Sequence, residues 1–197
     1  MPTTIVTAPL ATPLSVSEVK EHLRVDHASQ DTLIWTYLSA AIGEFEDLSG
    51  RALIESTWDY TLDHFPFYSF YLPKGRLVSV MSIKYTPEGG AETEIPSSGY
   101  AVDTKSDPGR VTLNDGVHWP VMALIPAGGF VARFVAGWAN AAAVPADIKA
   151  ALLFKCQLLY DGSTRATTNA VAEIAMRRLD EVFRQTVERW RTWESMG

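Results

Sequence analysis

The chain has 197 residues, 47% of them hydrophobic, so it can bury a core and predicts one domain or one domain with an insertion. The net charge of −6 disfavours nucleic-acid binding through a basic face, and a single cysteine excludes an intramolecular disulfide framework. No signal-peptide pattern and no run of eighteen apolar residues is present, which predicts a protein made without export and without a membrane span.

Two capped helices are predicted near the amino terminus. Ser15 stands three residues before Glu18, the spacing of a capping box, and a short helix is expected to run to about Leu23. A longer helix is expected to begin near residues 29–31 and to end at Gly50, a residue that tolerates a left-handed cap. Its apolar residues recur at steps of three and four and predict one buried face: Ile34, Leu38, Ala41, Ile42, Phe45 and Leu48.

The periodicity changes to two from about Leu53 to Ala139, which is typical of half-buried strands. Trp58, Tyr60 and Leu62 alternate with polar residues in the first of these strands. Turn signals rich in glycine and proline then separate further expected strands at 77–85, 111–113 and 130–135. The pattern predicts an antiparallel meander or a small barrel.

Two further helices are predicted after the strands. Pro145, which suits the first position of a helix, opens one whose apolar stripe is Ile148, Leu152, Cys156 and Leu159. Polar residues 161–169 are expected to form a linker. A last helix is expected from about Asn169 to Trp193, and one side of it carries Ala175, Leu179, Val182, Phe183, Val187 and Trp190.

The predicted fold class is α+β, with a helical core and an inserted antiparallel β module, because the strands lie between helices that share apolar stripes. We expect four parts. They are the amino-terminal helices of the helical core (1–52), the inserted β module (53–140), a core helix (141–162) and a carboxy-terminal helical arm (163–197).

The amino-terminal helix pair resembles that of the tailed-phage head–tail connector (adaptor) family. In that family LSxxEVKxHLRVD, a polar turn, a long helix and a GRAL segment recur in this order, and here they occupy residues 14–53. Further blocks follow the family's order: WDYTLDHF (58–65), LPKGRLVSVMSIKY (72–85), YAVD (100–103), PGRV (108–111), Trp119-Pro120 and VAGWANAAAVPADIKAA (135–151). The resemblance spans 14 to about 162 and is weakest over 163–197.

The resemblance implies a structural virion protein that forms a ring, usually dodecameric, at the head–tail junction below the portal. The ring would extend the DNA channel and dock the tail or a stopper protein. The implied partners are further copies of the chain, the portal protein and the tail or stopper protein, with DNA only as passing cargo and with no membrane. The protein would be made in the bacterial cytoplasm and would belong to a phage, a prophage or a gene transfer particle.

No catalytic, cofactor-binding or metal site is predicted, and the sequence contains no HExxH, P-loop or GxSxG motif. His22 and His27 would not share a helix face, so a metal site formed with Asp26 and Asp31 is disfavoured against a solvated polar turn. Cys156 lies on an apolar stripe and is interpreted as a small core residue, not as a nucleophile.

Candidate interface residues lie on the last helix, which follows a polar linker and carries arginines among acidic residues, with Asp180 and Arg184 as an i,i+4 pair. Two interpretations stay open: a docking arm for the portal or a neighbouring subunit, which we favour, and a fourth core helix. The arm interpretation assigns the interface to Leu179, Val182, Phe183, Val187, Trp190, Trp193, Arg184 and Arg189.

Two other functions remain as alternatives. Another neck or tail-completion structural protein would share the size, the acidity and the lack of catalytic motifs. A small cytoplasmic enzyme would need a pocket with convergent polar residues. Partner contacts are also expected at the loops 87–90 and 115–119, because loops on a rigid scaffold concentrate binding residues.

Overall fold

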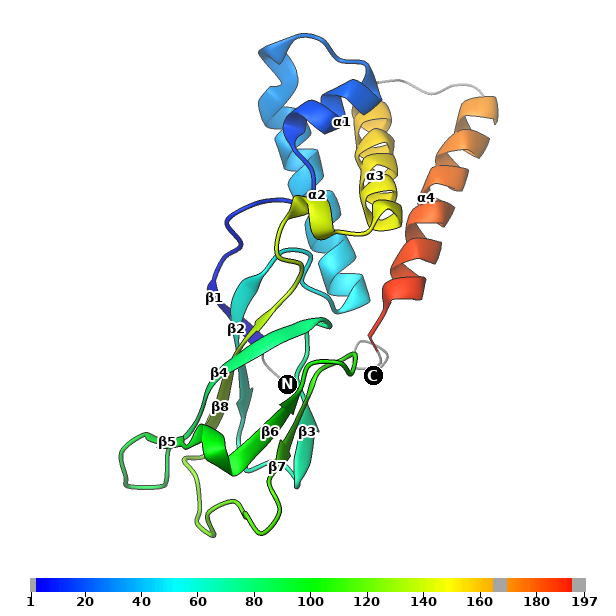
Figure 1. Cartoon of the computed structure of the whole chain (residues 1–197). Helices are drawn as coiled ribbons and strands as arrows, with labels where there is room; N and C mark the ends of the chain where they lie inside the picture. The colour runs from blue at the N-terminus through cyan, green and yellow to red at the C-terminus, as the bar shows by residue number, and fades with distance from the viewer. Residues whose placement is uncertain (1–2, 165–169, 193–197) are drawn as a thin grey trace.

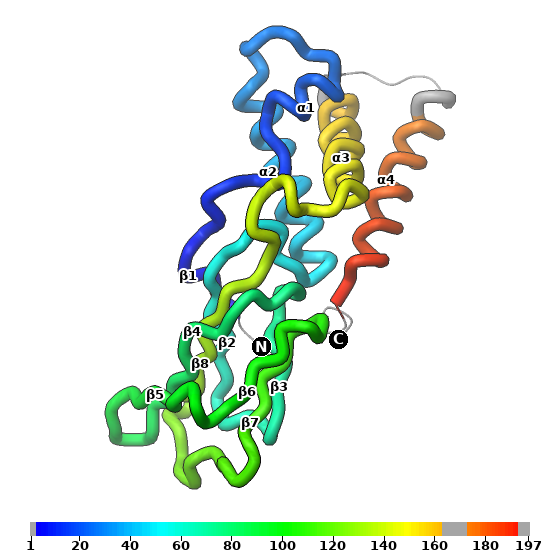
Figure 2. Tube along the Cα trace, in the orientation of Figure 1, coloured from blue at the N-terminus to red at the C-terminus, as the bar shows by residue number. Residues whose placement is uncertain are grey.

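The computed structural model describes residues 3–164 and 170–192. The molecule is elongated, with the α-helices at one end and the strands at the other (Figure 1, Figure 2). In the described part, four α-helices and two antiparallel sheets confirm the α+β class. The division of the chain into four parts stays a proposal.

The first two helices form where the capping residues predict them. In α1 (Val16–Leu23) the Ser15 hydroxyl accepts a hydrogen bond from the Glu18 N–H at 3.2 Å, and the Glu18 carboxylate accepts one from the Ser15 N–H at 2.7 Å. The longer helix, α2 (Asp31–Ser49), ends at Gly50 with a φ of 70°. Both predicted helix ends are therefore confirmed.

The late helices are α3 (Ala146–Thr164) and α4 (Ala170–Trp190). The carbonyl of Pro145 accepts a hydrogen bond from the Lys149 N–H at 3.2 Å, so the proline stands just before the helix, one position earlier than predicted. The predicted linker at 161–169 is shorter at its start, because α3 continues to Thr164; residues 165–169 lie outside the described part.

The strands form two sheets, ordered β1-β2-β8-β4-β5 and β3-β7-β6. Because β2 pairs with β1 and β8, and not with β3, the prediction of one meander or barrel is wrong in its connectivity. Strand β1, for which the sequence patterns predicted no strand, joins the sheet beside β2. The strands are β1 (Thr3–Thr7), β2 (Ser56–Leu62), β3 (Ser69–Tyr71), β4 (Leu77–Tyr85), β5 (Thr93–Ile95), β6 (Tyr100–Asp103), β7 (Arg110–Leu113) and β8 (Phe130–Ala136).

Two hydrophobic clusters fill the interior, one among the helices and one between the sheets. Alternate residues of β2 and β8 are buried, as predicted from the period of two. On α2, Leu48 was predicted to be part of the buried face, but this prediction is wrong, because its side chain is 47% exposed. The buried stripe continues from Phe45 to Ser49, a step of four, which turns Leu48 outward by about 100°.

Two of the connections between the helices and the sheets, α2–β2 and β8–α3, run side by side. Ile54 and Trp138 form an isolated parallel bridge, and the Glu55 N–H donates to the Trp138 carbonyl at 2.9 Å. Gly137 (φ 122°) allows this approach, because a Cβ there would meet the Ile54 carbonyl carbon at 2.5 Å. The close pairing fixes how the sheets are joined to the helical layer.

Candidate interaction surfaces

Helix α4 packs on α2 and α3 (Figure 1). Phe183 is buried, and its ring meets the Phe45 ring edge-on with the centroids 6.1 Å apart. Val187 is buried in the same cluster. The core-facing residues of this helix therefore fill the monomer's own interior, as the interpretation of a fourth core helix predicts and the favoured docking arm does not.

Lys155 joins three helices at the centre of this packing. Its Nζ lies 2.7 Å from Glu44 Oε1 on α2 and 3.9 Å from Asp180 Oδ1 on α4. The same ammonium group lies 4.9 Å from the centroid of the Phe183 ring. The lysine is almost fully buried, and its charge is balanced by these two carboxylates and the ring face.

The carboxy-terminal end of α4 is attached at several points. Arg51 Nε donates a hydrogen bond to the Trp190 carbonyl, and its second guanidinium nitrogen binds Asp107 at 2.7 Å. The Trp190 indole N–H donates to Asp147 at 2.9 Å, and its ring meets Trp138 edge-on with centroids 5.8 Å apart. These contacts tie the helix end to α3, to the α2–β2 connection and to the β6–β7 hairpin.

The predicted interface residues divide by their exposure. Val182 is 41% exposed, and Arg184 and Arg189 are exposed while forming ion pairs with Asp180 and Asp147. Phe183 and Val187 are buried, Leu179 and Trp190 are half-buried, and Trp193 lies outside the described residues. The contact of these residues with a portal or a neighbouring subunit stays a prediction. Of the predicted interface residues, Val182, Arg184 and Arg189 are exposed on the monomer and are accessible to another chain.

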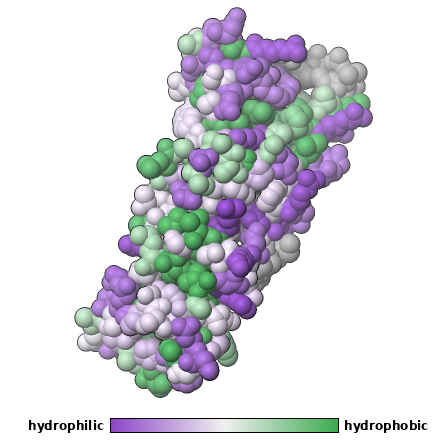
Figure 3. Space-filling view, viewed as in Figure 1, coloured by the Kyte–Doolittle hydropathy of each residue, from purple (hydrophilic) through white to green (hydrophobic). Residues whose placement is uncertain are grey.

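One exposed apolar residue of α4 was missed by the sequence patterns. Ile174 is 54% exposed and lies two turns before Val182. The helical period of 3.6 places Ile174 opposite Phe183 and turns Val182 about 100° away from Phe183. A search for a second apolar line on this helix would therefore have found both residues. Figure 3 shows hydrophobic and hydrophilic side chains together on the visible side of α4.

A groove of about 440 Å³ lies between α1 and α3. Most of its exposed lining is apolar, and charged side chains stand among the residues that line it. The apolar residues are Leu14, Ala146, Ala150 and Leu153. The polar residues are Glu18, Glu21, His22 and Lys149.

A second pocket, of about 650 Å³, lies where the helices meet the sheets. Its walls carry the cations Arg51, Arg76 and Lys105 and the carboxylates Glu55 and Asp107. Because Arg51 and Asp107 bind each other, the pocket contains a structural ion pair between the two parts of the molecule.

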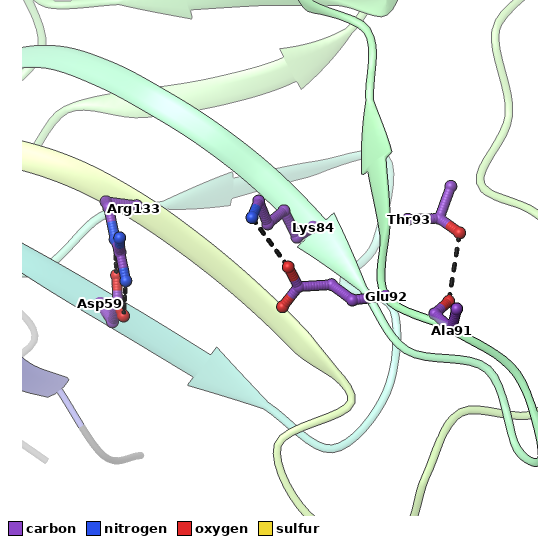
Figure 4. A network of polar contacts seen from close by, with 6 residues as sticks. All are labelled: Asp59, Lys84, Ala91, Glu92, Thr93 and Arg133. Atoms are coloured by element: carbon purple, nitrogen blue, oxygen red, sulfur yellow. Dashed lines mark hydrogen bonds and ion pairs between the residues drawn. The ribbon is translucent and has the colours of Figure 1, made fainter.

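The five-stranded sheet carries ion pairs near its surface. Arg133 on β8 binds the carboxylate of its register partner Asp59 on β2 through two hydrogen bonds of 2.8 Å, and Lys84 binds Glu92 at 2.7 Å (Figure 4). These acceptors raise the pKa of the Arg133 and Lys84 side chains above their usual values. The pairs lie near the surface, so they contribute little to stability.

A set of aromatic and apolar residues marks the loops at the far end of the sheets. The Trp119 indole N–H donates to the Phe67 carbonyl at 3.0 Å, and the Trp119 ring stacks on Phe65. The Phe67 side chain is 93% exposed, Val121 is fully exposed, and Met122 is about half exposed. The loop predicted to contact a partner, 115–119, therefore leads into an apolar surface.

In and beside the polar turn between α1 and α2, Asp31, His22 and His27 contact other side chains. Lys20 binds Asp31 at 2.7 Å, His22 Nε2 lies 3.0 Å from Gln157 Oε1, and the His27 ring bonds to a neighbouring serine. Across residues 3–164 and 170–192, no three His, Cys, Asp or Glu side chains are grouped to hold a metal ion. Cys156 is buried, and burial raises the pKa of its thiol to about 12.

Residues 13–100 match the model of the phage gp6-like head-tail connector protein family. Among solved structures, the chain is similar to one from the neck of an empty gene transfer agent (GTA) particle computed with C6 symmetry, with a TM-score of 0.74 and 25% identity over 98% of this chain and 96% of the other. A chain from the virion of a native GTA particle gives a TM-score of 0.72 and 26% identity at the same coverage.

A chain from the neck of a native GTA particle computed with C12 symmetry likewise gives a TM-score of 0.72 and 26% identity, over 98% of this chain and 96% of the other. No curated protein matches the sequence. None of the described helices combines the length and the apolar character that a bilayer crossing requires.

Proposed function

We propose that this chain, which belongs to the phage gp6-like head-tail connector family, forms a ring at the head–tail junction below the portal, where it extends the DNA channel and docks the tail or stopper protein. The family is structural and not enzymatic, and the chain is a head-tail connector protein of a phage or GTA neck. The ring, its position below the portal and its partners are what we propose.

The observation that carries the proposal is the match along nearly the whole chain to neck proteins. The helices and both sheets are included in an alignment that covers 98% of this chain with a TM-score of 0.74. The solved necks were computed with C6 and C12 symmetry, and such cyclic symmetry supports a ring of identical subunits. Location at the neck of a virion follows from the same similarity.

The charge of the chain supports a passage for DNA more than a binding site for it. With a formal net charge of −6, the subunit as a whole does not neutralise phosphates, and a channel built from it would not retain the DNA by attraction. We infer DNA as passing cargo, the portal protein as the head-side partner, and the tail or stopper protein as the tail-side partner.

The proposal is tested by imaging the full chain with purified portal protein. Negative-stain electron microscopy and mass photometry should find a ring of twelve subunits, each of 21.7 kDa, attached to one face of the portal. A six-fold ring that binds tail components and not the portal would instead favour another neck or tail-completion protein. A chain that stays monomeric with every neck component would overturn the ring.

A further inference from the structure

A ring of identical subunits requires two different complementary surfaces on each copy, because each subunit contacts its neighbours head to tail. The helical layer offers a convex surface on α4 and a concave one between α1 and α3. A contact between these two surfaces of neighbouring subunits rests on the proposed ring function.

The convex surface is the outer face of α4, which we define as Ile174, Arg178 and Val182. These residues follow one another at steps of four, and all three are exposed. Ile174 and Val182 are separated by about 12 Å along the helix axis. Between them lies the guanidinium of Arg178, whose aliphatic stem is able to cover apolar surface. Glu181, on the same side, accepts a hydrogen bond from Gln185 at 3.2 Å.

The concave surface is the α1–α3 groove, which is about as long as the apolar line of α4. Its α3 wall runs from Ala146 to Leu153, about 10 Å along that helix. Ala146 and Ala150 leave space above the backbone of this wall, because they have the smallest side chains that a helix can present without glycine. Small residues in a groove between two helices admit the side chains of a third helix.

The charges of the two surfaces are complementary. Glu18 and Glu21 are exposed at the α1 side of the groove and offer carboxylates to Arg178. Lys149, on the α3 side, offers a cation to Glu181. Opposite charges on both sides of an apolar centre favour one orientation of a docked helix over its reverse.

The two surfaces also lie on different sides of the subunit. On α3, Asp147 and Lys155 face α4, whereas Ala150 and Leu153 face the groove, about a third of a turn away. In Figure 1, α1 and α4 accordingly lie on different sides of α3. We propose that the outer face of α4 docks into the α1–α3 groove of the next copy, so that each subunit uses one surface on each side.

Disulfide trapping between two full-length variants tests this contact. We would mix Val182→Cys with Ala150→Cys under oxidising conditions that yield rings, and compare each variant alone and the wild type. The native Cys156 should stay silent because its thiol is buried. Covalent dimers are expected in the mixture, and monomers are expected in each variant alone and in the wild type.

The possible outcomes distinguish a failure of the proposed contact from a failure of the proposed ring. Rings in the electron microscope without covalent dimers in the mixture would overturn the contact and leave the proposed function standing. Covalent dimers of Val182→Cys alone would also overturn it, because they would reveal a two-fold contact. The absence of both rings and covalent dimers would overturn the contact and the proposed function together.

A charge reversal gives an independent measurement. Arg178→Glu should raise the subunit concentration needed for assembly at least about five-fold, and Glu21→Arg in the same chain should restore part of the loss. Arg76→Glu, at an exposed arginine outside both surfaces, serves as the matched control and should assemble like the wild type. Equal assembly of Arg178→Glu and this control would argue against the contact.

Discussion

Arg51 and Lys155 show how single charged residues hold this fold together. Each is nearly buried, and each contacts elements that are distant in the sequence. Arg51 satisfies the last carbonyl of α4 and neutralises Asp107, while Lys155 lies between two carboxylates and an aromatic ring. Since an unpaired buried charge costs several kcal/mol, both residues specify one arrangement of their neighbours.

Truncation of the neighbouring residues Val182 and Phe183 should change the free energy of unfolding by very different amounts. Phe183→Ala leaves a cavity against Phe45 and is expected to lower the free energy of unfolding by about 3–5 kcal/mol. Val182→Ala, on the exposed side of the helix, should change it by about 0.5 kcal/mol or less. Urea unfolding followed by tryptophan fluorescence measures both. Equal effects would contradict the packing of α4 described above.

The stability of the protein should depend on pH because of the carboxyl group of Glu46. Its carboxylate accepts a hydrogen bond from the Leu53 N–H at 2.7 Å, yet burial raises its pKa above the unfolded value of 4.5. The folded state therefore binds the proton more tightly than the unfolded state does. This contribution to stability is present at acid pH and is lost as the pH rises through the raised pKa.

Glu46→Gln removes that titration while keeping an acceptor for the Leu53 N–H. Relative to wild type, the variant should gain stability as the pH rises from 4.5 through the raised pKa, and the difference should then stay constant. Urea midpoints between pH 4 and pH 8 measure this difference. Glu88→Gln, in an exposed loop, is the control, and a flat difference for Glu46→Gln would refute the assignment.

At the scale of elements, α4 is a two-sided helix. One side carries Phe183 and Val187 into the helical cluster, while the other carries exposed apolar and basic residues. A helix with one buried and one partly apolar exposed side suits a core element that also contacts another chain. The docking arm and the fourth core helix, kept open from the sequence, are therefore compatible roles of different faces.

Truncation after Asp161 tests the core role of α4. The shortened chain is expected to aggregate or to lose cooperative unfolding, because it exposes the surface that Phe183 and Val187 cover. Circular dichroism melting and ANS fluorescence measure this outcome. Val182→Ser, which alters only the exposed side, should melt like the wild type. A soluble truncated chain with an unchanged melting temperature would restore the separate-arm interpretation.

The loops at the far end of the sheets remain candidates for contact with another subunit or the next neck component. In loops 87–90 and 115–119, amide hydrogen exchange should slow in at least one loop on assembly, because a docked partner excludes water. The exposed Phe67 and Val121 beside the second loop make that loop our first choice. Identical hydrogen exchange of both loops in the free protein and in assembled particles would exclude both loops as partner contacts.

At the scale of the whole molecule, an elongated subunit with helices at one end and sheets at the other suits a layered ring (Figure 1). Since head-to-tail contacts close only at one rotation, assembly is expected to depend on subunit concentration and to be promoted by a portal template. Sedimentation velocity over a range of concentrations, with and without portal protein, measures this. A tight two-fold dimer that is independent of concentration and portal would contradict a ring.

Local signals in the sequence determined several helix ends, the buried face of a strand and the family resemblance of this protein. The capping box at Ser15 and the glycine cap at Gly50 set helix ends through interactions within one turn, so neighbouring residues were enough to predict them. The period of two in β2 identified its buried face for the same reason. The ordered blocks from residue 14 to about 162 led to the connector family, which the family model supports over residues 13–100.

Only the tertiary structure decided which of these elements meet. The pairing of β2 with β8 and the addition of β1 at the sheet edge depend on contacts between residues far apart in the sequence, which no local period encodes. The same holds for α4: its amphipathic pattern predicted an apolar stripe but not the surface that covers it. Phe183 therefore proved to be core, and Ile174 and Val182 proved to be exposed, because the position of α2 and α3 selects which side of the helix is buried.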